Sequence, residues 1–434
     1  MRIIDLIEKK RDGNELSTDE INWFITAYTA DHIPDYQVSA LLMAILFRGM
    51  NRRETVDLTR AIAYSGDQLD LHDVAPFVVD KHSSGGVGDK TTLVVQPLVA
   101  ACGIPVGKMS GRGLGSSGGT LDKMESINGW HFEMSLEQFK RQLGNIGLVL
   151  SGQTTELAPA DGKLYALRDV TGTVASMPLI AASIMSKKLA AGADAIVLDV
   201  KSGSGAFMHT VAEARQLARI MVDIGKDAGR KTVALISDMN QPLGHAIGNA
   251  LEVREAIATL HGDGPHSFWE HCLDVAGYML LLADKASTLA AAKAQVTAVR
   301  DQGLAWQKFR DMVAAQGGDV AQIDNPNTLP TARCVEPIPA PQTGTLAAMD
   351  TTAIGWACVR LGGGRMSKSD QIDHAVGFVL PAKIGNHFQA GETMGFIHAN
   401  DPDKLNQARS EILAALTWSD TPVEPLPHIY DVVT

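Results

Sequence analysis

Apolar and polar positions along the first 66 residues follow the period of amphipathic helices. Ser17 with Glu20, and Asn51 with Glu54, have the spacing of a capping box, in which two side chains cap a helix start reciprocally. Gly66 follows the last apolar repeat as a stop signal. The chain is therefore predicted to begin with a helical module.

From residue 77 the pattern changes to short apolar runs, each followed by a glycine loop or a helical stretch. The runs are Phe77–Val79, Ile104–Met109, Leu148–Leu150, Ala195–Val200 and Thr232–Ile236. This alternation predicts an α/β domain with a mainly parallel sheet and crossover helices. Residues 161–194 interrupt it with a helical pattern, and we expect them to fold as helices that join the N-terminal ones, because sheet domains rarely contain so long a structureless loop.

The last quarter of the chain differs in its proline content and in its pattern of apolar residues. Prolines at 326, 330, 337, 339 and 341 predict a stiff linker, and the alternating runs Ala375–Val379 and Thr393–Ile397 beyond it predict a small α+β domain. The expected division is a helical domain (1–66 and 161–194), a larger α/β domain (67–160 and 195–330), a linker (331–344) and a C-terminal α+β domain (345–434).

Composition narrows the choice of partners. With 434 residues and 45% hydrophobic content, the chain can bury a large core in several domains. A net charge of -11 disfavours nucleic acid or an anionic membrane surface as a partner. The four cysteines form no CxxC pair, which disfavours a zinc site or a disulfide framework. The start lacks a signal-peptide core and no apolar run approaches about 18 residues, so we expect a cytoplasmic protein without a membrane helix.

Two glycine-rich stretches carry the densest chemistry. Residues 81–92 (KHSSGGVGDKTT) and 110–125 (SGRGLGSSGGTLDKME) each follow a strand and precede a helix. Glycines let the backbone approach an anion closely, and free N–H groups at a helix start point toward it. A single such loop is also explained as a tight packing turn, but two at neighbouring strand ends favour one shared anion site. Neither has the GxxxxGK[ST] spacing of a P-loop.

A third group of polar residues falls in the inserted helical segment. It comprises Tyr165, Arg168, Ser183, Lys187 and Lys188. Ser183 and Lys187 are four residues apart, so on a helix they share one face and reach a common ligand. Taken alone, the group is more simply explained as a solvated basic face.

Together, the three stretches resemble those of the thymidine and pyrimidine-nucleoside phosphorylase family. The second is close to the family's signature, and the resemblance continues through residues 199–208 (DVKSGSGAFM) and 236–239 (ISDM) to the C-terminal domain. It implies a homodimer whose subunits bind pyrimidine nucleoside and phosphate between the helical and α/β domains. It further implies inorganic phosphate as co-substrate, no organic cofactor and a potassium-type ion.

Carried over residue by residue, the resemblance assigns two sets of ligands. The phosphate set is Lys81, Ser83, Thr92, Ser110 and Thr120, and the base set is His82, Tyr165, Arg168, Ser183 and Lys187. The implied reaction is phosphorolysis of the N-glycosidic bond of uridine, thymidine or deoxyuridine, giving the free base and a (deoxy)ribose 1-phosphate. Arg168 and Lys187 would stabilise the charge on the departing base, while His82 hydrogen-bonds or protonates its O2.

Two lysines bear on details of the resemblance. Lys108 occupies a position where family members of broad specificity resemble this chain, and it is expected to contact a ribose 2′-OH through water, which favours uridine and thymidine both as substrates. The implied cation positions are Gly88, Lys90, Leu243, Ala246 and Glu255. Lys90 replaces a small residue there, so its ammonium either fills or repels the site.

The signature departs from the family elsewhere too. Ser116-Ser117 replaces a usual His-Thr pair, which puts in doubt the coupling of phosphate binding to domain closure; Met124 replaces Leu or Ile, and Ser84 replaces Thr. The rival hypotheses are a phosphoribosyltransferase of the anthranilate type, which needs pyrophosphate and magnesium, and a non-catalytic nucleoside- or phosphate-binding protein. Phosphate-dependent release of free base distinguishes all three.

Overall fold

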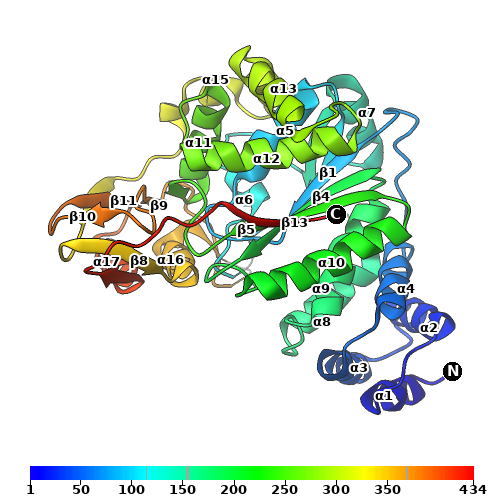
Figure 1. The fold of residues 1–434 in the computed structure, drawn as a ribbon. Helices are drawn as coiled ribbons and strands as arrows, with labels where there is room; N and C mark the ends of the chain where they lie inside the picture. The colour runs from blue at the N-terminus through cyan, green and yellow to red at the C-terminus, as the bar shows by residue number, and fades with distance from the viewer. Residues whose placement is uncertain (114, 153–155, 368–369) are drawn as a thin grey trace.

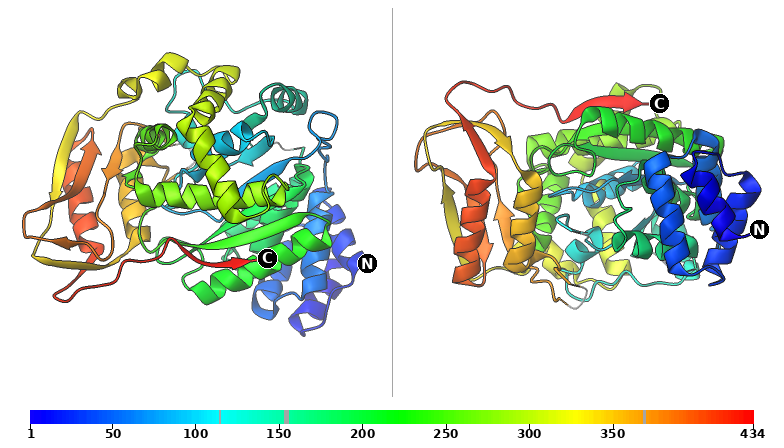
Figure 2. Two further views of the ribbon diagram at one scale, coloured as in Figure 1. Left: turned by 45° about the horizontal axis from the view of Figure 1, so that its top comes forward. Right: turned by 90° about the horizontal axis from the view of Figure 1, so that it is seen from below.

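The computed structural model describes residues 1–113, 115–152, 156–367 and 370–434. Leu114, inside the second glycine stretch, lies outside the described residues. The helical domain and the C-terminal domain lie at opposite ends of the molecule, with the α/β domain between them (Figures 1 and 2).

The helical domain is built from two separate parts of the chain, as predicted. Its helices are α1 (Ile3–Arg11), α2 (Thr18–Thr29), α3 (Asp35–Arg48), α4 (Arg52–Ala63), α8 (Pro159–Asp169) and α9 (Met177–Ala190). Both predicted capping boxes are present, at Ser17 and at Asn51. Leu164 of α8 and Leu179 of α9 are buried in one apolar cluster with Leu41 of α3, so the inserted helices share the core of the N-terminal ones.

The α/β domain contains the five strands expected from the apolar runs. They are β1 (Val79–Ser83), β2 (Val106–Ser110), β3 (Leu148–Gly152), β4 (Ala195–Ser202) and β5 (Lys231–Asp238). β1, β4 and β5 pair in parallel, and β2 pairs in parallel with β3. The first run differs from its strand, because β1 begins at Val79, where the predicted run ends. Lys81 and His82 therefore lie on the strand and not in the loop that follows.

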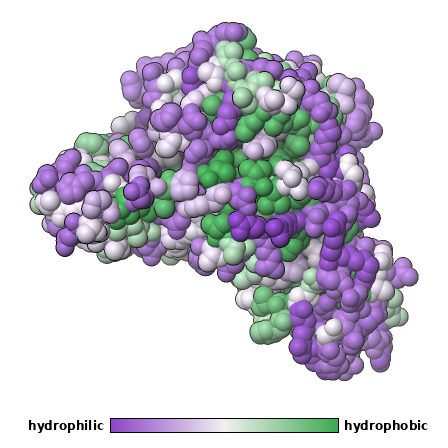
Figure 3. All heavy atoms as spheres, in the orientation of Figure 1, coloured by the Kyte–Doolittle hydropathy of each residue, from purple (hydrophilic) through white to green (hydrophobic). Residues whose placement is uncertain are grey.

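Helices cover these strands and connect them. They are α5 (Thr91–Ala101), α6 (Thr120–Met124), α7 (Leu136–Ile146), α10 (Val211–Asp227), α11 (Asn249–His261), α12 (His266–Leu282), α13 (Leu289–Asp301), α14 (Leu304–Ala315), α15 (Val320–Asp324) and the short η1 (Pro326–Thr328). α5 is buried along nearly its whole length, which its continuous run of apolar residues favours. Apolar residues also gather in the middle of the face shown in Figure 3, around α12.

The C-terminal domain combines strands with two helices and a π-helical turn. Its elements are β7 (Cys334–Pro339), β8 (Gly344–Met349), α16 (Thr351–Cys358), η2 (Val359–Gly363), β9 (Gly377–Val379), β10 (His387–Phe388), β11 (Thr393–Ala399), α17 (Pro402–Ala414) and β12 (Leu416–Ser419). β7 lies inside the segment expected to be a linker, and the short β6 (Ala246–Ile247) of the preceding domain pairs with β9. The linker prediction is wrong for residues 334–339.

The physical reason is the place of β7 in its sheet. The strand order is β6-β9-β11-β7, so β7 is an edge strand, and Pro337 and Pro339, which lack an N–H, are tolerated there. The end of the chain also leaves the C-terminal domain, because β13 (Ile429–Val433) pairs antiparallel with β5 (Figure 1). None of the described helices is long and apolar enough to cross a membrane.

Candidate active site

The first glycine loop connects the end of β1 to the start of α5. Gly85 and Gly88 have φ values of +93° and +75°, in the left-handed region that glycine adopts without strain. The Oγ of Ser83 accepts a hydrogen bond from the N–H of Gly85 at 3.2 Å, and the Oγ of Ser84 accepts one from the N–H of Lys201 at 2.8 Å. The loop is thus fixed on β4 through a serine where the family usually has threonine.

Asp89 is the carboxylate within this loop. It accepts hydrogen bonds from the N–H and the Oγ1 of Thr91 at 3.1 and 2.7 Å. Burial alone would raise its pKa, but Lys81, Lys201 and Lys123, together with a hydrogen bond from Ser83, hold the pKa of Asp89 well below its ordinary value. The carboxylate of Asp89 thus accompanies the fully buried Lys81 of β1.

The second glycine loop lies against the first. Lys123 is buried, and its Nζ donates to the carbonyl of Asp89 at 2.7 Å and to the carbonyl of Gly118 at 3.1 Å, while Glu252 pairs with it at 3.1 Å. Its ammonium therefore joins the two loops, and sequence reasoning did not single it out. Asp122 closes the second loop onto α6 by accepting from the N–H of Gly113 at 2.6 Å and from Arg112 at 3.0 Å.

The remaining predicted phosphate ligands lie at the ends of neighbouring elements. Ser110 is the last residue of β2, Thr120 the first of α6, and Thr92 lies in the first turn of α5. β1 and β2 are in contact, and they end at Ser83 and Ser110. Ligands of α/β domains bind at the carboxyl ends of the strands, so these two ends are the expected place for a shared site.

The inserted helices contribute the other basic side chains. On α9, the Nζ of Lys187 donates to the Oγ of Ser183 at 2.9 Å and to the carboxylate of Asp161 on α8 at 2.5 Å. Ser183 and Lys187 share a face, as their spacing predicts. No local signal points to Asp161, because its pairing with Lys187 spans 26 residues and depends on how α8 packs beside α9.

Arg168 does not belong to a solvated face. It is 3% exposed and donates to the carbonyls of Thr173, Val174 and Leu179 at 3.4, 2.7 and 3.1 Å, which fastens the turn between α8 and α9. These bonds use three of the five N–H groups of the guanidinium and leave two for a ligand. Its guanidinium carbon lies 6.0 Å from the ring centre of Tyr165, one turn earlier.

The two sides of the site meet at the end of β1. Lys188 of α9 pairs with Asp80 of β1 at 2.7 Å. Burial lowers the pKa of His82 well below its ordinary value, and the ammonium groups around it lower it further. These groups are those of Lys188, Lys108, Lys187 and Lys81. His82 is therefore a neutral imidazole at neutral pH, and ammonium groups from both domains surround it, a suitable environment for an anion.

Lys108 is buried on β2 beside this group. Its Nζ donates to the carbonyl of Lys81 at 2.7 Å and lies 3.8 Å from Asp80. Burial and the neighbouring Lys188 lower the pKa of Lys108 well below its ordinary value.

A buried polar cluster lies beside the first loop, where the N–H of Ser84 donates to the carbonyl of Asp199 at 3.0 Å. Asp199 of β4 accepts hydrogen bonds from Ser237 at 2.5 Å and from Lys201 at 2.7 Å, and its Oδ2 lies 2.8 Å from the Nε2 of His271. The sequence alone did not predict this cluster, because its residues come from β4, β5 and α12 and come together only in the folded chain.

The five positions expected to hold a monovalent cation do come together, but around the ammonium of Lys90. Its Nζ lies 2.8 Å from the carbonyl of Leu243, 2.9 Å from that of Ala246 and 2.7 Å from Glu255. The N–H of Lys90 donates to the carbonyl of Gly88 at 3.0 Å. The oxygens that a potassium ion would need are already bound by a cation of the chain itself, so these residues do not fit the ion.

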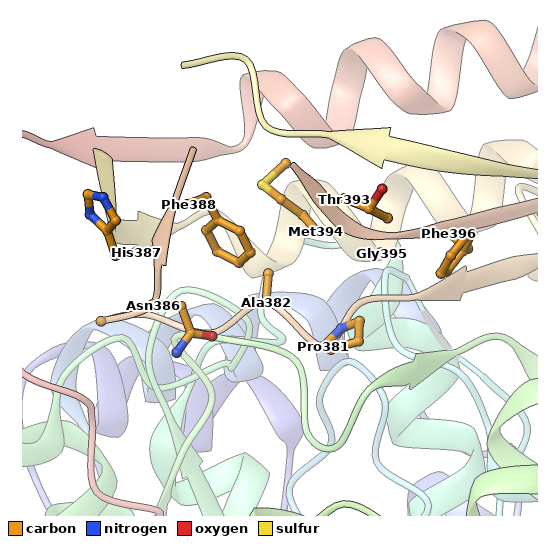
Figure 4. A pocket seen from close by; sticks show the side chains of 10 residues that line it. Pro381, Ala382, Asn386, His387, Phe388, Thr393, Met394, Gly395 and Phe396 are labelled. Carbon is orange, nitrogen blue, oxygen red and sulfur yellow. The ribbon is translucent and has the colours of Figure 1, made fainter. Parts of the chain in front are cut away.

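A cavity of about 440 Å³ lies elsewhere, in the C-terminal domain (Figure 4). It lies between β10, β11 and the segment 381–386, with Ala382, Phe388 and Met394 among its lining residues. None of the predicted site residues lines it.

The fold and the site together define an α/β protein with an attached helical bundle and two neighbouring glycine loops, and its relatives are glycosyl transferases. Residues 4–66 match the family described as "Glycosyl transferase family, helical bundle domain", and residues 75–306 match "Glycosyl transferase family, a/b domain". Residues 345–419 match "Pyrimidine nucleoside phosphorylase C-terminal domain".

Curated relatives agree with these matches over the whole chain. The pyrimidine-nucleoside phosphorylase of Geobacillus stearothermophilus is 51% identical over 434 residues, which is 100% of both chains. That of Staphylococcus aureus strain N315 is 52% identical over the same length and coverage. The chain therefore belongs to the pyrimidine-nucleoside phosphorylase family.

A solved structure shows the wider relationship of the fold. Anthranilate phosphoribosyltransferase from Thermus thermophilus superposes with a TM-score of 0.60 at 19% identity, covering 72% of this chain and 99% of that one. At this identity the likeness concerns the fold alone. It accounts for the transferase considered as a rival from the sequence.

Proposed function

We propose that this chain catalyses the reversible phosphorolysis of pyrimidine nucleosides to free base and (deoxy)ribose 1-phosphate. The observation that carries the proposal is the end of β1, where Lys81 and His82 lie between the glycine loop and the lysines of α9. The site thereby offers an anion-binding loop on one side and basic hydrogen-bond donors on the other. Full-length relatives named for this activity support the same conclusion.

On the phosphate side, the ligands are Lys81, Ser83, Thr92, Ser110 and Thr120. A buried ammonium and several hydroxyls at strand and helix ends can surround the oxygens of a phosphate dianion. Lys123 contributes indirectly, because it holds the two loops at a fixed separation. Inorganic phosphate enters as co-substrate, and no organic cofactor takes part in the reaction.

On the base side, the ligands are His82, Tyr165, Arg168, Ser183 and Lys187. A phosphate oxygen forms the new bond to C1′ while the N-glycosidic bond breaks and its electron pair goes to the base. Arg168 and Lys187 stabilise that negative charge, as donors prepositioned in a largely buried site do most effectively. The proton that completes the neutral base comes from phosphate or solvent.

The lowered pKa of His82 favours one of its two expected roles. An imidazole that is already neutral at physiological pH has no extra proton to give, so it donates a hydrogen bond to O2 of the base. Protonation of O2 by His82 is the less favoured alternative.

Substrate breadth follows from Lys108. With one N–H directed to the carbonyl of Lys81, its ammonium retains donors that reach a ribose 2′-OH through water. We therefore propose that uridine, thymidine and deoxyuridine are all substrates.

The proposed assembly is a cytoplasmic homodimer. Large apolar side chains are exposed on the neighbouring helices α1 and α3, where Ile4, Tyr36 and Phe47 are 48%, 73% and 78% exposed. Such a group on one surface is typical of an interaction site.

One absorbance assay tests the function. Purified protein is mixed with uridine, thymidine or deoxyuridine, with and without inorganic phosphate, and release of the free base is followed. We expect release from all three nucleosides only when phosphate is present. If no base is released, the free base is incubated with phosphoribosyl pyrophosphate and magnesium: formation of a nucleotide would indicate the transferase, and no reaction in either assay would indicate a binding protein. Cleavage of thymidine with uridine left intact would contradict the role of Lys108.

A further inference from the structure

The Lys90 ammonium has the environment of a bound metal ion. The side chain is fully buried, and three oxygens lie within 2.9 Å of Nζ: the carbonyls of Leu243 and Ala246 and a carboxylate oxygen of Glu255. A lysine ammonium has three N–H donors, so each donor has one oxygen acceptor and none is left over. The Phe268 ring, with its centre 5.1 Å away, lies on another side of the ammonium.

The loop that supplies these oxygens, residues 242–246, is held by two side chains. The Nζ of Lys383, from the C-terminal domain, donates to the carbonyls of Pro242 and Gly244 at 2.7 and 2.6 Å. Glu255 accepts from the N–H groups of His245 and Ala246 at 3.0 and 2.8 Å. Four carbonyls of the loop therefore accept hydrogen bonds from the Nζ atoms of two lysines, Lys90 and Lys383.

Two glycines show how closely the loop 242–246 packs against its surroundings. Gly244 has φ +67°, and a Cβ placed on it would lie 2.0 Å from Glu255 Oε1 and 2.8 Å from Lys90 Nζ. A Cβ on Gly88 would lie 2.6 Å from the carbonyl oxygen of Leu243. The loop thus packs directly onto both the first glycine loop and the ammonium.

Lys90 also stands at a position from which it affects the phosphate site. It precedes α5, whose first turn carries Thr92, and its N–H is bonded to the carbonyl of Gly88. Anchoring its side chain in the loop 242–246 therefore fixes where the first glycine loop ends and where α5 begins.

We propose that the ammonium of Lys90 is a built-in monovalent cation, which replaces a potassium-type ion and makes this enzyme independent of added potassium. The activity part of this inference rests on the proposed phosphorolysis. The structural part does not, because a cation that fastens the loop 242–246 also affects thermal stability.

The first test uses the wild-type protein. It is exchanged into tetramethylammonium, sodium or potassium chloride at equal ionic strength, and both kcat/KM for phosphate and the melting temperature are measured. We expect kcat/KM to agree within about twofold and the melting temperature to be unchanged across the three salts. An increase of tenfold or more in kcat/KM, or a clear rise in melting temperature, specific to potassium would overturn the proposal.

The second test removes the ammonium in two ways. Lys90→Thr leaves a space lined by oxygens. We therefore expect this variant to have a higher melting temperature in potassium chloride than in tetramethylammonium chloride, and a kcat/KM about tenfold higher. Lys90→Met fills the space with an apolar chain and should be impaired equally in every salt. Lys226→Thr, at an exposed position of α10, is the control and should behave as the wild type.

The outcomes separate the two proposals. A Lys90→Thr protein as stable and active as the wild type in all three salts would show that the ammonium holds nothing in place. If the variant does not fold, the wild-type comparison still decides the matter. If the wild type releases no base with phosphate, the proposed function fails, while the melting temperatures continue to test the role of Lys90.

Discussion

His82 combines burial with a positive surrounding, and both disfavour its protonated form. We expect kcat/KM for the nucleoside, measured at saturating phosphate, to stay level from about pH 8 down to about pH 6, below the range where an ordinary histidine titrates. An ionisation near pH 6.5 that is lost in His82→Gln would instead show that His82 gains a proton and acts as an acid.

The imidazole of His82 should also make the free energy of unfolding depend on pH. Because its pKa is lower in the folded than in the unfolded chain, the unfolded chain binds the proton first as the pH falls below about 6.5. This contribution to stability is present above that pH and is lost below it. Urea unfolding at about pH 7 and about pH 5 should show the wild type losing more stability than His82→Gln. An equal loss in both proteins would contradict the lowered pKa.

Lys187 is proposed to stabilise negative charge on the departing base. Replacing it with methionine keeps its length but removes the charge, and we expect kcat/KM to fall about 10²–10³-fold, as for loss of one transition-state donor. Steady-state phosphorolysis of uridine at saturating phosphate measures this. Lys163→Met is the matched control on α8, since Lys163 pairs with Asp31 at the surface, and it should retain near-normal turnover. Near-normal turnover of Lys187→Met itself would remove the proposed role.

At the level of elements, the turn between α8 and α9 depends on one guanidinium. Arg168→Lys cannot reach all three carbonyls, and leaving buried carbonyls unpaired should lower the free energy of unfolding by about 2 kcal/mol. KM for the nucleoside should rise as well, because Tyr165 and Ser183 lie on the two helices that the turn joins. Arg310→Lys, on the exposed part of α14, should change stability by less than about 0.5 kcal/mol in the same urea titration. Equal effects of the two substitutions would contradict the structural role of Arg168.

Elements with strong local signals could be predicted from the sequence. The capping boxes at Ser17 and Asn51 depend on residues three apart, and the parallel strands on short apolar runs. β7 could not be predicted, because prolines usually exclude a strand and only its edge position in the sheet permits them. β13 was missed for a different reason: its partner β5 lies far earlier in the chain, and no local pattern encodes that pairing.

For the molecule as a whole, the sequence indicated candidate ligands of the site but not the residues that these candidates contact. Lys187 and Arg168 carry their own chemistry and are visible as residue types, whereas Asp161 and Lys123 acquire a role only through packing between distant segments. For the expected cation positions, too, the sequence alone could not show how the side chains interact. Their grouping came from the resemblance, but whether Lys90 fills or repels the site could be decided only from the distances around its ammonium.

The proposed homodimer also belongs to this scale, and it is argued from the exposed apolar side chains of α3. Tyr36 and Phe47 are 73% and 78% exposed, so they add no buried apolar surface to the single chain. In the proposed dimer, a second copy of the helical domain would cover them. We expect the double substitution Tyr36→Glu and Phe47→Glu to convert a dimer into a folded monomer, because each carboxylate would have to be desolvated in the interface. Multi-angle light scattering after gel filtration measures the mass. Val335→Glu, at an exposed apolar residue of the C-terminal domain, should leave the dimer intact. An unchanged mass for the double variant would place the interface on another surface.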